Sequence, residues 1–179
     1  DVWEDLFADM KNRVANTTGE CYGLCLGDIA AAATGESVYA PYSIGVASLG
    51  IPFYQVIGNH DHFHVETNLT DDDAAAAFEA AFGPRNYSFD LGQFHFVVID
   101  NCIYEKGWRR YPFKYGFEDE FMEWLKGDLA LVPKDVPIMF CSHVDFFDEF
   151  GKLHESMVFD DVDCRYKFEE FYETLQSFE

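Results

Sequence analysis

The stretch Val56-Ile57-Gly58-Asn59-His60-Asp61-His62 decides how this chain folds and what chemistry it can carry. It begins as an apolar run and ends in an amide, two imidazoles and a carboxylate, a density of coordinating groups that packing alone seldom requires. A second apolar run ends in a carboxylate at Leu26-Gly27-Asp28. Open α/β sheets place their chemistry at the carboxyl ends of neighbouring strands, so both polar endings are expected to meet there. The pattern predicts a metal site.

The bulk composition limits the class of protein and its partners. With 179 residues, 49% hydrophobic and 18% aromatic, the chain can bury one core, so we expect a single domain over residues 1–179. A formal charge of -21 and only 12 Lys and Arg residues disfavour an extended nucleic acid as partner and favour multivalent cations. No apolar stretch approaches the roughly 20 residues that span a bilayer. Composition leaves the compartment and the oligomeric state open.

Hydrophobic periodicity and breaker residues predict alternating helices and strands. The expected helices cover residues 2–14, 42–49, 74–82, 121–129 and 166–178, and the expected buried strands cover residues 21–26, 53–57 and 137–141. Alternation over residues 86–91 and 94–99 around Gly92-Gln93 predicts an antiparallel hairpin. Strands that alternate with helices, joined to a hairpin, indicate an α/β fold with mixed sheets.

Three of the expected strands end in possible metal ligands, namely Asp28, Asn59 and His143. An anionic oxygen, an amide oxygen and an imidazole form a mixed donor set that suits Mn, Fe or Zn better than calcium. A carboxylate can also bridge two cations about 3.5 to 4 Å apart, which would activate water and neutralise charge on a phosphoryl group. Asp28 is the candidate for that bridge.

Two residues next to Asn59 are candidates for catalysis. If Asn59 binds metal, His60 lies near the substrate, where its imidazole could protonate a leaving alkoxide. Asp61 would orient that ring, because a neighbouring carboxylate favours the charged imidazole. The alternative for an isolated Asn-His-Asp is a turn with capping side chains.

In this order, Leu26-Gly27-Asp28, Gly58-Asn59-His60-Asp61 and Ser142-His143 resemble the central motifs of the calcineurin-like metallophosphoesterases. Other stretches resemble one bacterial branch of that superfamily, and the resemblance extends from Cys21 to about Phe147. These stretches are Phe82-Gly83-Pro84, Tyr87-Ser88-Phe89, the run Phe94–Asn101, Glu123-Trp124-Leu125 and Asp128-Leu129.

The resemblance implies a four-layered α/β sandwich with a dinuclear metal centre. Such a centre hydrolyses small phosphate mono- or diesters by attack of a metal-bound hydroxide on phosphorus. By this resemblance Asp28 is the bridging ligand, and Asn59 and His143 bind one metal. His60 and Asp61 match the pair that assists departure of the leaving group.

The chain departs from the family pattern at both ends. The family opens with a strand that bears an Asp and usually a His or Gln, and closes with a Gly-His-x-His strand, and neither motif occurs here. We therefore expect a phosphoesterase domain without its first and last motif strands, which retains too few ligands for a stable dinuclear site. We expect a trimmed piece of a longer protein, and the alternative is a natural relic without activity.

The leading functional hypothesis is accordingly a metal-dependent phosphoester hydrolase. The alternative from another class is a non-catalytic binding or scaffold domain. A third possibility is a metal-dependent nuclease or nucleotide pyrophosphatase on the same scaffold. Fold resemblance does not identify the substrate.

Four other histidines are weighed and left out of the ligand set. His62 and His64 are expected in a surface loop, although either could touch the substrate or a group that supports the ligands. His95 lies within an alternating strand, where packing or hydrogen bonding is expected. Nothing near His154 in the sequence recommends it.

Several further polar residues have both a functional and a structural interpretation. Arg109-Arg110 could bind a substrate anion or pair with surface carboxylates. Asp100-Asn101 could line the cleft or form the turn after a strand. A carboxylate from Asp145, Asp148 or Glu149 could hydrogen-bond a ligand imidazole.

Overall fold

The computed structural model describes residues 2–31, 36–62, 71–104, 113–145, 158–159, 162–163 and 165–178. These residues form an α/β structure with both parallel and antiparallel strand pairs, which confirms the coarse fold prediction. Among them, no helix is both long and apolar enough to cross a bilayer.

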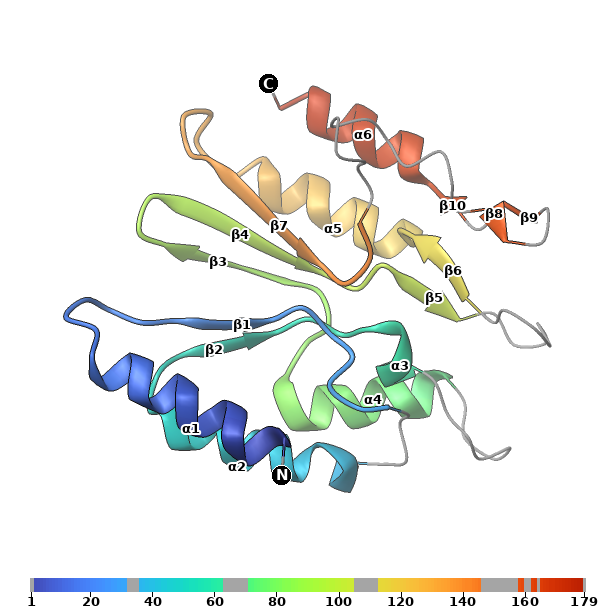
Figure 1. Ribbon diagram of the computed structural model, residues 1–179. Coiled ribbons are helices and arrows are strands. Elements are labelled where there is room, and N and C mark those ends of the chain that lie inside the picture. The colour runs from blue at the N-terminus through green and yellow to red at the C-terminus, as the bar shows by residue number, and fades with distance from the viewer. Residues whose placement is uncertain are drawn as a thin grey trace.

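The first sheet consists of two parallel strands that carry the first two candidate ligands. Strand β1 (Gly23–Cys25) pairs with strand β2 (Phe53–Gln55), and Gly23 lies opposite Phe53. Three helices lie on its outer side (Figure 1), namely α1 (Val2–Ala15), α2 (Ala40–Leu49) and α4 (Asp71–Phe82). Pro41 lies at the start of α2 and Gly50 caps its end with a positive φ of 66°, as expected from the sequence.

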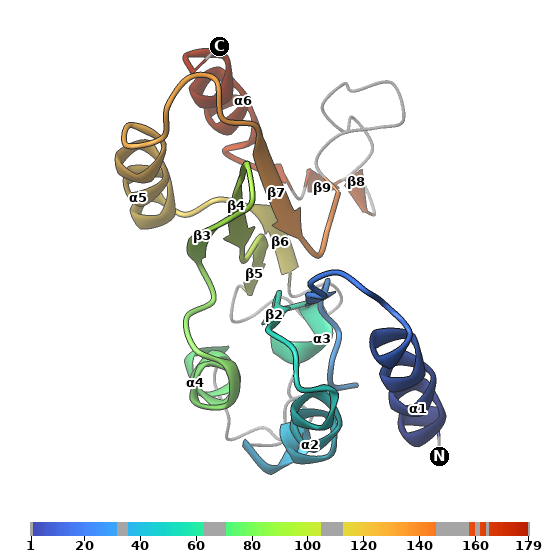
Figure 2. The ribbon, with the colours of Figure 1, turned by 90° about the vertical axis from the view of Figure 1, so that its left-hand side faces the viewer.

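The second sheet has mixed strand directions, as the sequence predicts. Strand β3 (Tyr87–Leu91) and strand β4 (Phe94–Ile99) form an antiparallel hairpin. Strand β7 (Ile138–Ser142) runs parallel to β4 on its other side. Helices α5 (Asp119–Leu129) and α6 (Phe168–Gln176) lie on the side of this sheet that faces away from β1 and β2 (Figure 2).

Several short elements escape sequence reasoning because each is too brief to show a hydrophobic period. One of them, the single-turn helix α3 (Asn59–His62), carries much of the candidate site. The others are η1 (Glu36–Tyr39), β5 (Cys102–Tyr104), β6 (Phe113–Gly116), β8 (Val158–Phe159), β9 (Val162–Asp163) and β10 (Arg165–Tyr166).

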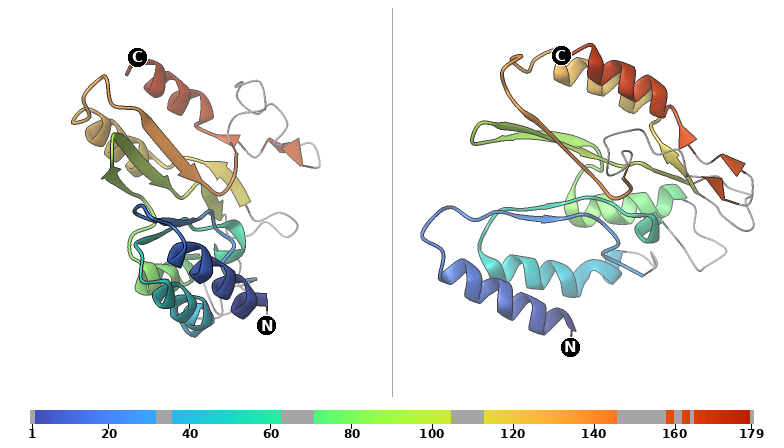
Figure 3. Two further views of the ribbon diagram at one scale, coloured as in Figure 1. Left: turned by 60° about the vertical axis from the view of Figure 1, so that its left-hand side comes forward. Right: turned by 45° about the horizontal axis from the view of Figure 1, so that its top comes forward.

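Three apolar clusters hold these layers together, and both views in Figure 3 show the layered arrangement. One cluster includes Phe7 and Phe78 and packs α1, α2 and α4 against the first sheet. Another includes Leu125 and Phe171 and packs α5 and α6 against the second sheet. The third is centred on Val56 and fills the space between the two sheets.

Tyr87 and a ring stack join the two sheets directly. The Tyr87 hydroxyl donates to the backbone oxygen of Gln55 at 3.1 Å and accepts the Gln55 N–H at 3.2 Å, so β3 is tied to β2. The rings of Tyr54 and Phe89 stack with centroids 3.7 Å apart. Burial of the aromatic rings and the satisfied backbone groups together fix the spacing of the two sheets.

The prediction that the strands before Asp28 and His143 are buried is wrong for part of each strand. Leu24 in β1 and Leu26 directly after it are 40% and 52% exposed, and Met139 in β7 is 45% exposed. Both β1 and β7 lie at the edge of their sheets among the described residues. In this chain an apolar run therefore also occurs on strands that the described neighbouring elements cover only in part.

His95 is held between two carboxylates, which confirms the expectation that it hydrogen-bonds. Its Nδ1 lies 2.7 Å from Asp90, and its Nε2 lies 2.9 Å from Asp128 on α5. Burial by itself lowers the pKa of His95, but the hydrogen bonds to Asp90 and Asp128 outweigh burial and raise the pKa. Two acceptors on opposite ring nitrogens favour the charged imidazolium, which ties the hairpin to α5.

We expect the stabilising effect of His95 to depend on pH. The pKa of His95 is higher in the folded state than in the unfolded state. The contribution of His95 to the free energy of unfolding is therefore fully present below the unfolded pKa of about 6.5 and is lost as pH rises through the folded pKa. Urea unfolding of wild type and His95→Gln should therefore differ more at about pH 6 than at about pH 9. An equal difference at both pH values would contradict this account of the cluster.

Candidate functional site

The turn after β1 presents the Asp28 carboxylate through an unusual backbone conformation. Gly27 has a φ of 100° and Asp28 a φ of 54°, so both lie in the left-handed region. Asp is one of the few residues with a side chain that tolerates this region. A Cβ on Gly58 would collide with Oδ1 and the backbone N of Asp28, so the two strand ends approach closely only because residue 58 is glycine.

Asp61 connects the turn after β1 to the start of α3. Its carboxylate is fully buried and accepts the backbone N–H groups of Ala30 at 2.9 Å, Gly58 at 2.9 Å and Ile29 at 3.3 Å. Burial raises the pKa of Asp61, and these three N–H donors offset the rise in part. The carboxylate thereby satisfies backbone groups of two segments that no strand ladder pairs.

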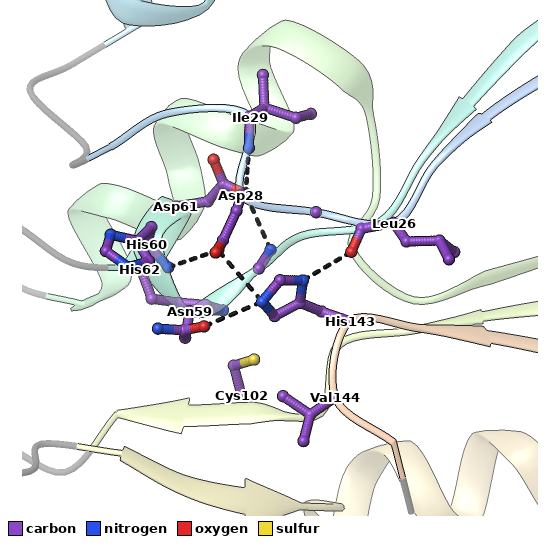
Figure 4. Close-up of polar contacts among 12 residues, drawn as sticks. Leu26, Asp28, Ile29, Asn59, His60, Asp61, His62, Cys102, His143 and Val144 are labelled. Atoms are coloured by element: carbon purple, nitrogen blue, oxygen red, sulfur yellow. Dashed lines mark hydrogen bonds and ion pairs between the residues drawn. The ribbon is translucent and has the colours of Figure 1, made fainter.

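The three predicted ligands meet at one point (Figure 4), although they come from different sheets. The Nε2 atom of His143, after β7, lies 3.0 Å from Oδ1 of Asn59 and 3.3 Å from Oδ1 of Asp28. The Asp28 oxygen also accepts the backbone N–H of His60 at 3.0 Å. Asp28 and Asn59 follow neighbouring parallel strands as expected, whereas His143 reaches them from the facing sheet.

The protonation of His143 makes this contact chemically informative. Nδ1 lies 2.7 Å from the carbonyl oxygen of Leu26, which can only accept, so Nδ1 carries a proton. In the neutral ring, Nε2 then presents a lone pair toward the oxygens of Asp28 and Asn59. The lone pair and these oxygens repel one another, and a second ring proton or a metal cation between them would relieve the repulsion. Reversal of the Asn59 amide would relieve only the contact with Asn59 and leave that with Asp28.

The candidate site is partly open to solvent, which a ligand or substrate requires. The side chain of Asp28 is 35% exposed and that of His143 is 20% exposed. Among the described residues, no three His, Cys, Asp or Glu side chains form a group that could hold a metal. Asp28 and His143 are two residues of these types, and the third donor of the predicted set is the amide of Asn59.

The predicted pair His60 and Asp61 is adjacent to these donors, but the two side chains do not work as a unit. Nδ1 of His60 lies 2.9 Å from the carbonyl oxygen of Ala31, which orients the ring. Both oxygens of Asp61 are occupied by the backbone donors described above. Asp61 therefore orients the backbone of the turn and does not orient the His60 ring.

The expectation that His62 lies in a surface loop is wrong. It is fully buried, and its Nε2 lies 3.0 Å from Asp100 Oδ2. Asp100 also accepts a 2.9 Å bond from Arg85. Burial alone raises the pKa of Asp100, but His62 and Arg85 outweigh it and lower the pKa. The pattern could not show this pairing, because 38 residues separate the two partners.

The remaining candidates are not part of the described cluster. The His143 ring pairs with the backbone of Leu26, a role that the sequence analysis offered to Asp145, Asp148 or Glu149. Of those three, only Asp145 lies among the described residues. The others that lie outside them are His64, Arg109, Arg110, Asp148, Glu149 and His154.

Comparison with known proteins leaves the family assignment as a prediction. No family model matches the chain, and no curated protein matches it at a significant level.

We expect Gly58→Ala to separate the two strand ends. The added methyl group would push against the backbone and the carboxylate of Asp28 and destabilise the fold by about 1–3 kcal/mol, the usual effect of overpacking. Hydrogen exchange of the His60 amide should also become faster, because that N–H bonds Asp28. Urea unfolding and amide exchange measure the two effects.

Gly127→Ala is the matched control for this substitution. A Cβ at Gly127, within α5, would have no neighbour within 4 Å. Alanine is favoured over glycine in a helix interior, so this variant should be more stable than wild type by about 0.5–1 kcal/mol. Equal effects of the two substitutions would show that the contact with Asp28 is unimportant.

We expect Asp61→Asn to weaken the connection between the two turns. Asn keeps one acceptor oxygen but places an NH2 group against at least one backbone N–H, at a cost of about 1–3 kcal/mol in the free energy of unfolding. Urea denaturation measures this change. Asp9→Asn, which breaks an exposed ion pair with Arg13, should leave stability almost unchanged.

Proposed function

We propose that this chain is a metallophosphoesterase-type domain in which Asp28, Asn59 and His143 bind a divalent cation. The observation that carries the proposal is the convergence of these side chains on His143 Nε2, at 3.0 Å and 3.3 Å. A carboxylate, an amide oxygen and an imidazole from three separate segments form a donor set for Mn, Fe or Zn.

The immediate surroundings also fit a cation. The Leu26 carbonyl fixes the proton of His143 on Nδ1, and this is the usual way in which a protein turns the other ring nitrogen toward a metal. Asp28 contributes a negative charge that is partly exposed. The chain as a whole carries a formal charge of -21, which attracts cations to its surface.

The proposed reaction is hydrolysis of a small phosphate mono- or diester. A divalent cation at this place would supply Lewis acidity and an activated water, and the family resemblance adds a second cation that shares Asp28. His60 follows Asn59 directly and has its ring fixed through Nδ1, so it is the group proposed to pass a proton to the leaving oxygen. Asp61 maintains the backbone on which these side chains depend.

The layered fold agrees with this proposal. Two facing sheets with helices on both outer sides place the ends of β1, β2 and β7 together, and every proposed ligand follows one of these strand ends. We propose that this arrangement is the metallophosphoesterase sandwich that the sequence motifs suggest. Function is nevertheless argued from the site, because one fold serves many reactions.

Titration with Mn²⁺ tests the metal site. Loss of an outer partner alone lowers metal affinity about 10- to 100-fold, so loss of a ligand in Asp28→Asn or His143→Phe should lower it at least as much. Isothermal titration calorimetry measures the affinity. His95→Gln, which changes a histidine far from the donors, should bind Mn²⁺ as wild type does. Wild-type protein that binds no Mn²⁺, or an Asp28→Asn variant with unchanged affinity, would refute the proposal.

Hydrolysis of p-nitrophenyl phosphate and bis-p-nitrophenyl phosphate with Mn²⁺ tests the reaction. We expect His60→Ala to lower turnover by about 10²- to 10⁴-fold, the usual contribution of a general acid, while Mn²⁺ affinity stays unchanged. Activity that survives in both His60→Ala and Asp28→Asn would contradict the assigned roles. Mn²⁺ binding without turnover of either ester would instead favour a non-catalytic binding domain.

A further inference from the structure

The dipeptide Asp100-Asn101, directly after β4, contacts the segments that carry two of the three proposed ligands, Asn59 and His143. Asp100 reaches α3, which begins at Asn59, through the buried ring of His62. Asn101 reaches the segment after β7 through the backbone of Val144.

The carboxylate of Asp100 is buried, and both of its oxygens have hydrogen-bond partners. His62 Nε2 lies 3.1 Å and 3.0 Å from its two oxygens, Arg85 donates to it at 2.9 Å, and the Cys102 N–H donates at 3.1 Å. The side chain of Asp100 is only 6% exposed. A carboxylate with this many donors has little freedom, so the His62 ring and the turn of helix that carries it are held in one place.

The Asn101 contact fixes the other side. Its Nδ2 donates to the Val144 oxygen at 2.6 Å, and its Oδ1 accepts the Val144 N–H at 3.3 Å. The amide thus satisfies both backbone groups of the residue that follows His143, as a neighbouring strand would. Asn101 is fully buried, and its own backbone oxygen accepts the Gly116 N–H at 3.0 Å. Figure 4 shows Val144 beside His143 and opposite the α3 residues.

We propose that Asp100 and Asn101 are positioning residues that set the separation between the Asn59 and His143 side chains. Neither touches the cation or the substrate. Asp100 and Asn101 are joined by one planar peptide unit, so their positions relative to each other vary little. Because one anchors α3 and the other anchors the segment after His143, they act together as a short frame at the end of β4. The cation-binding role of the frame rests on the proposed function, whereas the positioning itself does not.

The variants Asp100→Asn and Asn101→Ala test this inference. The first replaces one acceptor oxygen by an NH2 group that faces donors, and the second removes both bonds to Val144. We expect the ring ¹⁵N and ¹³C NMR signals of His143 to shift or broaden in both variants without any metal. Mn²⁺ affinity should fall about 10- to 100-fold, as it does when an outer partner is lost.

Asp128→Asn is the matched control, since it makes the same isosteric change in a carboxylate that also holds a buried histidine, His95. Asp128 contacts His95 near the start of β4, and Asp100 directly follows the end of that strand. The control should lower stability toward urea while the His143 signals and Mn²⁺ affinity stay as in wild type. If Asp100→Asn and Asn101→Ala behave like the control in both measurements, their role is structural only and the inference is overturned.

Two further measurements keep the test decisive. If the buried substitutions prevent folding, Arg85→Met removes one donor to Asp100 from a side chain that is 29% exposed, and it should move the His143 signals in a milder form. Unmoved signals in this variant would overturn the inference. If wild-type protein binds no Mn²⁺, the proposed function fails, while the NMR comparison in the absence of metal still decides the positioning role.

Discussion

The candidate site depends on the hydrogen bonds of one buried carboxylate. Asp61 accepts backbone N–H groups of Ile29, Ala30 and Gly58 and so joins the segments that follow β1 and β2. Neither segment belongs to a strand ladder at this point, so without the carboxylate these backbone donors would need other partners or water. The turn that presents Asp28 and the start of α3 are therefore held together by this connection.

Because the proposed ligands come from both sheets, a cation bound among them would act as a cross-link. Asp28 and Asn59 follow strands of the first sheet, and His143 follows a strand of the second. Other described contacts between the sheets include the apolar cluster around Val56, the Tyr87 hydroxyl and the stack of Tyr54 on Phe89. A ligand that binds only the folded state stabilises it in proportion to the logarithm of its concentration. Cation affinity and cohesion of the layers are therefore expected to vary together.

The sequence predicts the three proposed ligands better than it predicts the hydrogen bonds around them. Asp28, Asn59 and His143 can be grouped because each ends an apolar run, and chain direction brings such ends together. The contact of His62 with Asp100 cannot be found this way, because the partners lie 38 residues apart on elements of different type. Backbone donors such as those bound by Asp61 carry no residue signature at all. Periodicity likewise misses single-turn helices and two-residue strands, which are too short for a hydrophobic pattern to repeat.

The positive φ of 54° at Asp28 limits which residues can replace it during evolution. Asn and Gly enter the left-handed region almost as easily as Asp, whereas most other side chains are strained there. Neutral drift at this position is therefore channelled toward residues that keep the turn but remove the negative charge. A descendant with Asn at this position would superpose closely on this chain and yet have lost an anionic donor, so that shared shape would be a poor guide to shared chemistry.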